Sequence, residues 1–216
     1  MSDDLLPWIV QTYGQVAPDI SFYSSDLNKD EINIQDVADD VSNIPDDLDS
    51  IKVEGLITNL SGNTLKFLNL LQNDRRNWEG IHFFPTDPFS TSRQDQPSSP
   101  AFLAIIIAAM KTTKCLGIGC NLSDTAAYSC LATGLLAEDG IQELELWRTQ
   151  DLEANAAKVL AEAMVRTTCL KRFAFLGDNF RDEHTCAALV EALKRNRSLE
   201  GLQFGLSNDG TSLGKF

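Results

Sequence analysis

The sequence has few of the residues that build catalytic and metal centres. Its 216 residues include two histidines and five cysteines, and no two cysteines show the C-x-x-C spacing of zinc and redox motifs. The motifs that mark nucleotide sites, zinc proteases and serine hydrolases are absent, namely G-x-x-x-x-G-K-[ST], G-x-G-x-x-G, H-E-x-x-H and G-x-S-x-G. These absences exclude the enzyme classes that the motifs define, and we expect no catalytic residue, no cofactor and no metal.

The two histidines are not expected to act together. His82 falls in a predicted strand and His184 in a predicted helix, so the two imidazoles belong to opposite layers. A metal site or a general base shared between them is therefore not predicted.

Long apolar runs and an excess of basic residues are also missing. The longest apolar run covers residues 101–110, about half the length that spans a bilayer, and the opening Met-Ser-Asp-Asp lacks the basic segment of a secretory signal. The 31 acidic residues outnumber the 18 basic ones, and the net charge of −13 disfavours binding to the phosphate backbone of nucleic acids. We expect neither a membrane nor a nucleic acid as partner.

The cysteines are odd in number and irregularly spaced, which is typical of buried free thiols in a reducing compartment. We therefore expect a cytoplasmic protein. The five residues are Cys115, Cys120, Cys130, Cys169 and Cys186.

What the sequence does contain is an internal repeat of about 29 residues. A strand signature of the form L-x-x-L-x-L is followed each time by apolar residues at helical spacing i, i+3, i+4, i+7. In the two clearest units every matched pair is 29 residues apart. The strand positions are Ile141, Leu144 and Leu146, matched by Leu170, Phe173 and Phe175, and the helix positions are Ala157, Leu160, Ala161 and Met164, matched by Cys186, Leu189, Val190 and Leu193.

This pattern resembles the leucine-rich repeat family, specifically its ribonuclease-inhibitor-like type. The resemblance implies an α/β fold, a solenoid (horseshoe) of about seven repeats with concave parallel strands and convex helices. It covers residues 48–216, with units starting near 48, 78, 113, 141, 170 and 199. Residues 84–99 form a loop insertion rich in proline and serine, and Ser99-Pro100 predicts the start of a helix over residues 100–112.

Residues 1–47 are predicted to form an acidic N-terminal cap with a degenerate first repeat. They carry 11 acidic residues and one lysine, Lys29. The apolar residues Ala17, Ile20 and Phe22 predict a strand, and residues 31–43 predict a helix. The acidic side chains there are either a solvated helix face or a docking surface for a basic partner.

The candidate binding residues are those that the strands present away from the helices. Trp147 and Leu176 are predicted on adjacent strands with cationic side chains beside them, as in binding hot spots. An alternative, left open by the sequence, is that Trp147 only shields the loop that follows its strand. The candidate residues are Trp147, Arg148, Leu176, Lys171, Arg172, Phe84, Glu143 and Glu145. Glu143 and Glu145 share one face of a strand, about 7 Å apart from the strand rise, with no dry surroundings predicted for acid–base catalysis.

The resemblance implies a non-enzymatic scaffold that binds a protein partner through its concave face. Alternatives are a GTPase activator of the Ran type, a substrate adaptor with an N-terminal docking helix, or a fragment of an immune-type receptor. For the GTPase activator the candidate arginines are Arg75, Arg76, Arg93 and Arg148. No helix signature follows the last predicted strand, so we expect either a piece of a longer array or self-association through the edge formed by Leu199, Leu202 and Phe204.

Overall fold

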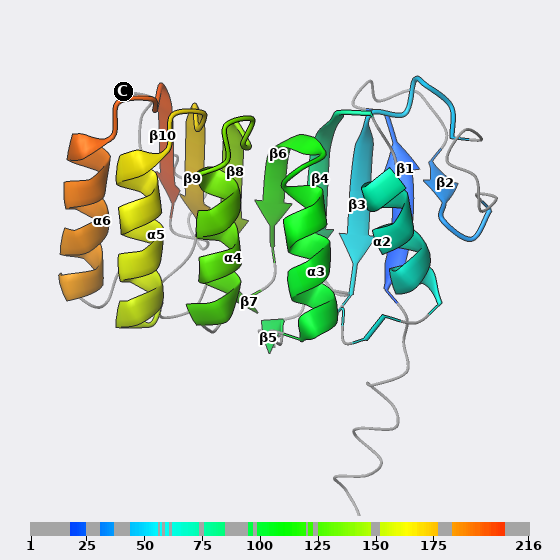
Figure 1. Cartoon of the computed structure of the whole chain (residues 1–216), viewed down its shortest axis with the longest axis horizontal. Coiled ribbons are helices and arrows are strands. Elements are labelled where there is room, and N and C mark those ends of the chain that lie inside the picture. The colour runs from blue at the N-terminus through cyan, green and yellow to red at the C-terminus, as the bar shows by residue number, and fades with distance from the viewer. Residues whose placement is uncertain are drawn as a thin grey trace, which may run out of the picture.

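Short strands with alternating apolar residues form one large, open, mostly parallel sheet in an α/β fold (Figure 1). The computed structural model describes residues 18–24, 31–36, 44–55, 57, 59–60, 62–73, 76–84, 95–96, 99–119, 121–122, 125–147, 152–176 and 183–205. Within these residues the sheet has eight strands in the order β10-β9-β8-β6-β4-β3-β1-β2. Its strands are β1 (Asp19–Tyr23), β2 (Ile32–Asn33), β3 (Ser50–Glu54), β4 (Trp78–Phe84), β6 (Thr113–Ile118), β8 (Glu143–Trp147), β9 (Arg172–Leu176) and β10 (Gly201–Gly205).

A helix connects each pair of neighbouring strands from β3 to β10, as parallel pairing requires. The helices are α2 (Asn63–Asn73), α3 (Pro100–Ala109), α4 (Thr125–Leu135), α5 (Ala154–Arg166) and α6 (Glu183–Arg195). All five cover the same face of the sheet (Figure 1). We call the other face the open face, because its side chains remain partly exposed. Two further short strands, β5 (Asp95–Gln96) and β7 (Asn121–Leu122), pair separately in parallel.

The core lies between the sheet and the helices and is made by the residues that the repeat pattern predicted. On β8 and β9, Leu144, Leu146, Phe173 and Phe175 are at most 1% exposed. The predicted apolar stripes of α2, α3, α4 and α5 are buried throughout. Since full burial of one such side chain stabilises the fold by about 1.5–3 kcal/mol, this repeated apolar layer supplies the main cohesion between neighbouring units.

The start of α3 follows the sequence prediction. Ser99 is the N-cap, and its hydroxyl oxygen accepts a hydrogen bond from the Phe102 amide at 3.1 Å while Pro100 occupies the first turn. The same hydroxyl donates to the Ile57 carbonyl at 2.7 Å and thereby ties α3 to the preceding unit. The helix ends at Ala109, earlier than the expected residue 112.

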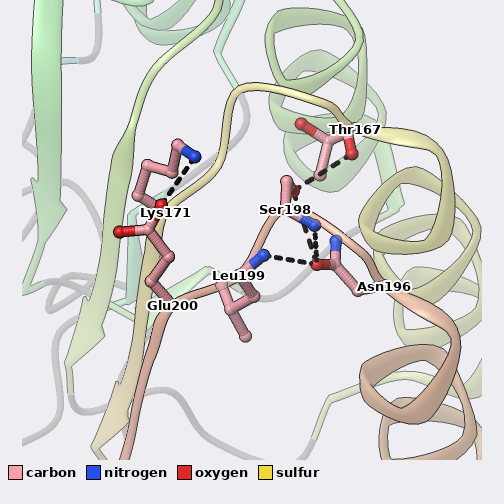
Figure 2. Close-up of polar contacts among 6 residues, drawn as sticks. All are labelled: Thr167, Lys171, Asn196, Ser198, Leu199 and Glu200. Carbon is pink, nitrogen blue, oxygen red and sulfur yellow. Dashed lines mark hydrogen bonds and ion pairs between the residues drawn. The ribbon is translucent and has the colours of Figure 1, made fainter.

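Polar contacts tie the last two units together (Figure 2). The Asn196 carboxamide oxygen accepts hydrogen bonds from the amides of Ser198 and Leu199, at 2.9 and 2.7 Å, and so shapes the turn between α6 and β10. The Asn196 amide group donates to the Met164 carbonyl at the end of α5. Lys171 and Glu200, which occupy equivalent positions of adjacent units, form an ion pair at 2.7 Å.

The N-terminal end differs from the prediction. A strand is present at the expected place, but β1 runs antiparallel to both β3 and β2, so it does not begin the parallel series. Ile32 and Asn33 form β2 and residues 34–36 form a turn, so the predicted helix over residues 31–43 is wrong in this part; residues 37–43 lie outside the described residues. The segment between β1 and β2 is too short for a helical crossover, and antiparallel pairing needs none.

The C-terminal end also departs from the pattern in one residue. Val190 was expected in the apolar stripe of α6, yet it is 47% exposed. The reason is that α6 is the last helix among the described residues, so only α5 is in place to cover it. Strand β10 is the last in the sheet order; Leu199 and Leu202 are half-buried there, and the side chain of Phe204 lies outside the described set. No described helix combines the length and apolarity needed to cross a bilayer.

Candidate functional site

The open face is organised in rows of side chains that run across the strands. One row contains Ser50, Gly80, Cys115, Glu143, Arg172 and Gly201, and the next contains Lys52, His82, Gly117, Glu145, Ala174 and Gln203. Each row mixes large side chains with glycine or alanine. The small residues leave space above the sheet, and neighbouring large side chains such as that of His82 fill this space.

Three aromatic side chains meet in this space. The ring centroids of Phe84 and Trp147 are 5.4 Å apart, although these residues belong to β4 and β8, which are separated by β6. The imidazole of His82 lies 6.2 Å from Phe84 and 6.1 Å from Trp147, with interplanar angles of 18° and 12°. We call His82, Phe84 and Trp147 the aromatic cluster; all three are half-buried.

Glycines on β4 and β6 make the aromatic cluster possible. A Cβ atom added at Gly80 would lie 2.5 Å from His82 Nε2, and one added at Gly117 would lie 2.4 Å from His82 Nδ1. The imidazole therefore occupies the space where two side chains would otherwise stand. At Gly119 an added Cβ would lie 3.2 Å from the Trp147 ring, so this glycine lets the indole reach across β6.

The imidazole of His82 is in its neutral form at pH 7. Burial lowers its pKa below the ordinary value of 6.5, because the charged form loses hydration. Its Nδ1 is buried without a hydrogen-bond partner among the described residues. Within the described part of the chain no side chain orients His82 as a catalytic base would be oriented, and its ring packs as a third aromatic surface.

Glu143, Glu145 and Cys115 form a second cluster beside the aromatic one. The Cys115 sulfur and the carboxylate oxygens of the two glutamates lie within 4.8 Å of one another. Glu143 also forms an ion pair with Arg172 at 3.0 Å. Burial, followed by the charge of Glu143, raises the pKa of Glu145, so its surroundings are drier than the sequence predicted.

The chemistry of this second cluster is limited by its charges. Burial and the two glutamates raise the pKa of Cys115 to about 12, so its thiol is protonated and a weak nucleophile at neutral pH. A cation that used all three groups would have to displace Arg172 from Glu143 and deprotonate Cys115. Both steps oppose metal binding. The arrangement is better described as a partly neutralised acidic site next to an aromatic surface.

A shallow hollow of about 280 Å³ lies on the open face, next to the aromatic cluster. It is lined by side chains of β3, β4, β6 and β8 and of the residue before β8, among them Ser50, His82, Lys114 and Glu143. His82 therefore borders both the hollow and the aromatic cluster. The two features are therefore continuous on the open face.

The structure separates Trp147 and Leu176 from the predicted cationic residues Lys171 and Arg172. Trp147 is in register with Leu176 on the adjacent strand, as expected, while the side chain of Leu176 and the whole of Arg148 lie outside the described residues. Lys171 and Arg172 do not stand beside Trp147. Arg172 is in register with Glu143, four residues from Trp147 along β8, or about 13 Å from the strand rise.

The arginine candidates for GTPase activation are mostly outside the described residues, which include Arg76 alone among them. The Arg76 guanidinium donates to the Ile44 carbonyl at 3.2 Å and lies 4.9 Å from the centroid of the Trp78 ring. Since Trp78 is buried, Arg76 is engaged in packing the first units and not extended into solvent as a catalytic finger would be.

Sequence reasoning missed His82 and the glycines that receive it. The signal was present in Gly117-Ile118-Gly119, two glycines on one face of a strand, which mark a place where another group approaches the backbone closely. His184, by contrast, lies on α6 in the helical layer, as predicted.

Comparisons with protein-family models, with curated proteins and with solved structures found no match for this chain.

Proposed function

We propose that this chain is a non-enzymatic scaffold that binds a protein partner through its open face, built as a leucine-rich repeat solenoid of the ribonuclease-inhibitor-like type. The observation that carries the proposal is the aromatic cluster, in which His82, Phe84 and Trp147 come together half-exposed on a face with no described covering element. Aromatic anchors at the centre of a polar surface are the usual hot spots of protein interfaces.

The repeat assignment is supported by the regular alternation of strand and helix. Along the series β3, β4, β6, β8, β9 and β10 each strand is parallel to the next, and each connection contains a helix. Equivalent residues of adjacent units are in contact, as Lys171 and Glu200 illustrate at a sequence separation of 29. In repeat proteins of this construction, the strand face is extended and available for binding.

The surface chemistry supports a protein partner. Charged side chains of both signs border this centre in ion pairs: Lys52, in register with His82, pairs with Glu31 and Glu54, and Glu143 pairs with Arg172 in the neighbouring row. The net charge of −13 disfavours nucleic acid. The described cysteines Cys115, Cys130 and Cys169 form no disulfide, which supports the cytoplasmic location that we propose.

The test compares the wild type with Trp147→Ala and with Val190→Ala as matched control. Val190 is an exposed apolar residue on α6, in the layer opposite to the proposed surface. Proteins retained by the wild type from a lysate of the source cells are identified by mass spectrometry, purified and titrated against all three proteins by calorimetry. We expect Trp147→Ala to weaken binding by at least about tenfold, as a hot-spot truncation does, with Val190→Ala unchanged.

Thermal unfolding of each variant separates loss of binding from loss of folding. If Trp147 only shields the loop after β8, Trp147→Ala will lower the unfolding temperature and leave the affinity of the folded protein unchanged. That result would contradict the proposal.

A further inference from the structure

Among the described residues of the open face, Glu145 is a carboxylate without a counter-ion. Glu145 lies on β8 two residues from Trp147, so both side chains point to the same face. Its neighbours in the row are Gly117 and Ala174, which have no side chain or a small one. Since the His82 ring fills the space above Gly117, the carboxylate is half-buried beside the aromatic cluster, with only the small side chain of Ala174 next to it on β9.

Three cations of the surrounding strands, Lys52, Arg172 and Lys171, are committed to other carboxylates. Lys52 pairs with Glu31 at 3.0 Å and with Glu54 at 3.6 Å. Arg172 pairs with Glu143, the other glutamate on the open face of β8, at 3.0 Å, and Lys171 pairs with Glu200 at 2.7 Å.

Glu145 itself forms no ion pair with a described cation. The influences that the described residues exert on its charge are its burial and the neighbouring Glu143. Lys114 lines the hollow, where its carbonyl accepts a hydrogen bond from the amide of Gln142, and no ion pair joins it to Glu145 among the described contacts. A half-buried carboxylate in these surroundings gains more from a cation than an exposed one does, because water screens the interaction less.

We propose that Glu145 and the ring of Trp147 together receive the guanidinium group of an arginine side chain of the protein partner. This inference rests on the proposed function, since it names the chemistry of the partner at the same face. The Cα atoms of the two residues are about 7 Å apart along the strand, a span that a guanidinium group and its last methylene groups bridge. The planar guanidinium stacks on an indole and donates two parallel hydrogen bonds to a carboxylate.

Arginine fits this place better than lysine or an apolar side chain. The rings of the aromatic cluster are nearly parallel, with interplanar angles of 12° to 30°, which suits a flat group laid beside them. A guanidinium group is also more weakly hydrated than an ammonium group and loses less on entering a half-buried site. The negative charge of the whole chain favours the approach of a basic partner.

The probe is the capped pentapeptide Gly-Gly-Arg-Gly-Gly, with the citrulline peptide as its uncharged isostere and the lysine peptide as a second cation. The indole N–H signal of Trp147, assigned from a Trp147→Phe variant, is followed by NMR while each peptide is added at pH 7. We expect a saturable shift with the arginine peptide and at least about tenfold weaker binding of the citrulline peptide, the usual scale for losing one charge-assisted contact.

Two variants with equal change of net charge decide whether the site is local. Glu145→Gln should weaken binding of the arginine peptide at least fivefold, whereas Glu200→Gln, which removes an exposed carboxylate already paired with Lys171, should leave it unchanged. Equal weakening by both variants, or equal binding of the arginine and citrulline peptides, overturns the proposal. Equal binding of the lysine peptide overturns the assignment to arginine.

The purified partner from the lysate experiment separates this inference from the proposed function. If that partner is lost by Trp147→Ala and retained by Glu145→Gln, and the arginine peptide gives no saturable shift, the arginine site is wrong and the scaffold proposal stands. If Trp147→Ala also leaves the partner bound, the proposed function itself fails.

Discussion

Replacing Gly117 by alanine should displace the His82 imidazole from the open face. The added Cβ would lie 2.4 Å from His82 Nδ1, against about 3.5 Å for atoms at optimal contact. The ring cannot slide away along the sheet, because its Nε2 already fills the space above Gly80. The imidazole must therefore leave its position between Phe84 and Trp147.

The structure sets the size and the sign of this effect. Leaving the aromatic cluster loses two ring contacts, each worth about 0.5–1.5 kcal/mol, whereas alanine is favoured over glycine within a strand by roughly 0.5–1 kcal/mol. Gly117→Ala should thus destabilise the protein by about 0.5–2 kcal/mol. In a His82→Ala background the space is free, and the same substitution should stabilise by about 0.5–1 kcal/mol.

Urea denaturation of the wild type, the two single variants and the double variant measures this reversal as a coupling free energy of about 1–3 kcal/mol. Gly201→Ala is the matched control, because the nearest atom to an added Cβ is Cγ of the flexible Arg172 side chain at 3.3 Å. It should be neutral or slightly stabilising in both backgrounds. If Gly117→Ala has the same effect with and without His82, the imidazole does not occupy the glycine space and the description of the aromatic cluster is wrong.

Three further predictions concern stability. Glu145→Gln should raise the unfolding temperature at pH 7, because the raised pKa of Glu145 means that its ionised form opposes folding. The gain should disappear below pH 4.5, where Glu145 is protonated in both the folded and the unfolded chain, and a gain independent of pH would contradict this prediction. Asn196→Ala should lower the free energy of unfolding in urea by about 1–2 kcal/mol, since it removes the acceptor for the Ser198 and Leu199 amides. Asn196→Asp keeps that acceptor and should lower the free energy of unfolding less, and equal losses in the two variants would refute the role of the carboxamide oxygen. Ser99→Ala should destabilise the folded protein by about 1 kcal/mol because the N-cap of α3 is lost, whereas Ser99→Thr keeps a hydroxyl there and should stay close to wild type. Thermal melts in which the two variants unfold at the same temperature would refute the capping role of Ser99.

Glu145 also links stability to the proposed binding. The charge that opposes folding is the charge proposed to hold the arginine of the partner, so Glu145→Gln should gain stability and lose binding together. Such opposed effects are common where a site is shaped for a ligand and not for the free protein.

The repeated part of the chain was largely predictable from sequence. Apolar residues at strand and helix spacing, such as Leu144 with Leu160, report burial directly because each periodicity places its residues on one face of an element. The N-terminal part was not predictable in the same way. Ile20 and Phe22 are buried as expected, but the direction of β1 depends on which strand edge is free, and that is not written in the local pattern.

The candidate site was predicted only in outline. Phe84 and Trp147 were identified as large residues on the strand face, yet their contact depends on the alignment of β4, β6 and β8, which are some 30 residues apart along the chain. His82 was set aside because no second histidine could meet it. Its role is visible only once Gly80 and Gly117 are placed under its ring.

The sequence by itself determined the alternation of strands and helices, the buried positions of the repeats and the acidic character of the chain, because each follows from residue spacing and composition. The tertiary structure alone decided the antiparallel end of the sheet, the pairing of Arg172 with Glu143 and the position of Glu145 outside the ion pairs of the described cations. These depend on which side chains face each other across strands, and a shift of one residue in register would exchange the open face with the buried one.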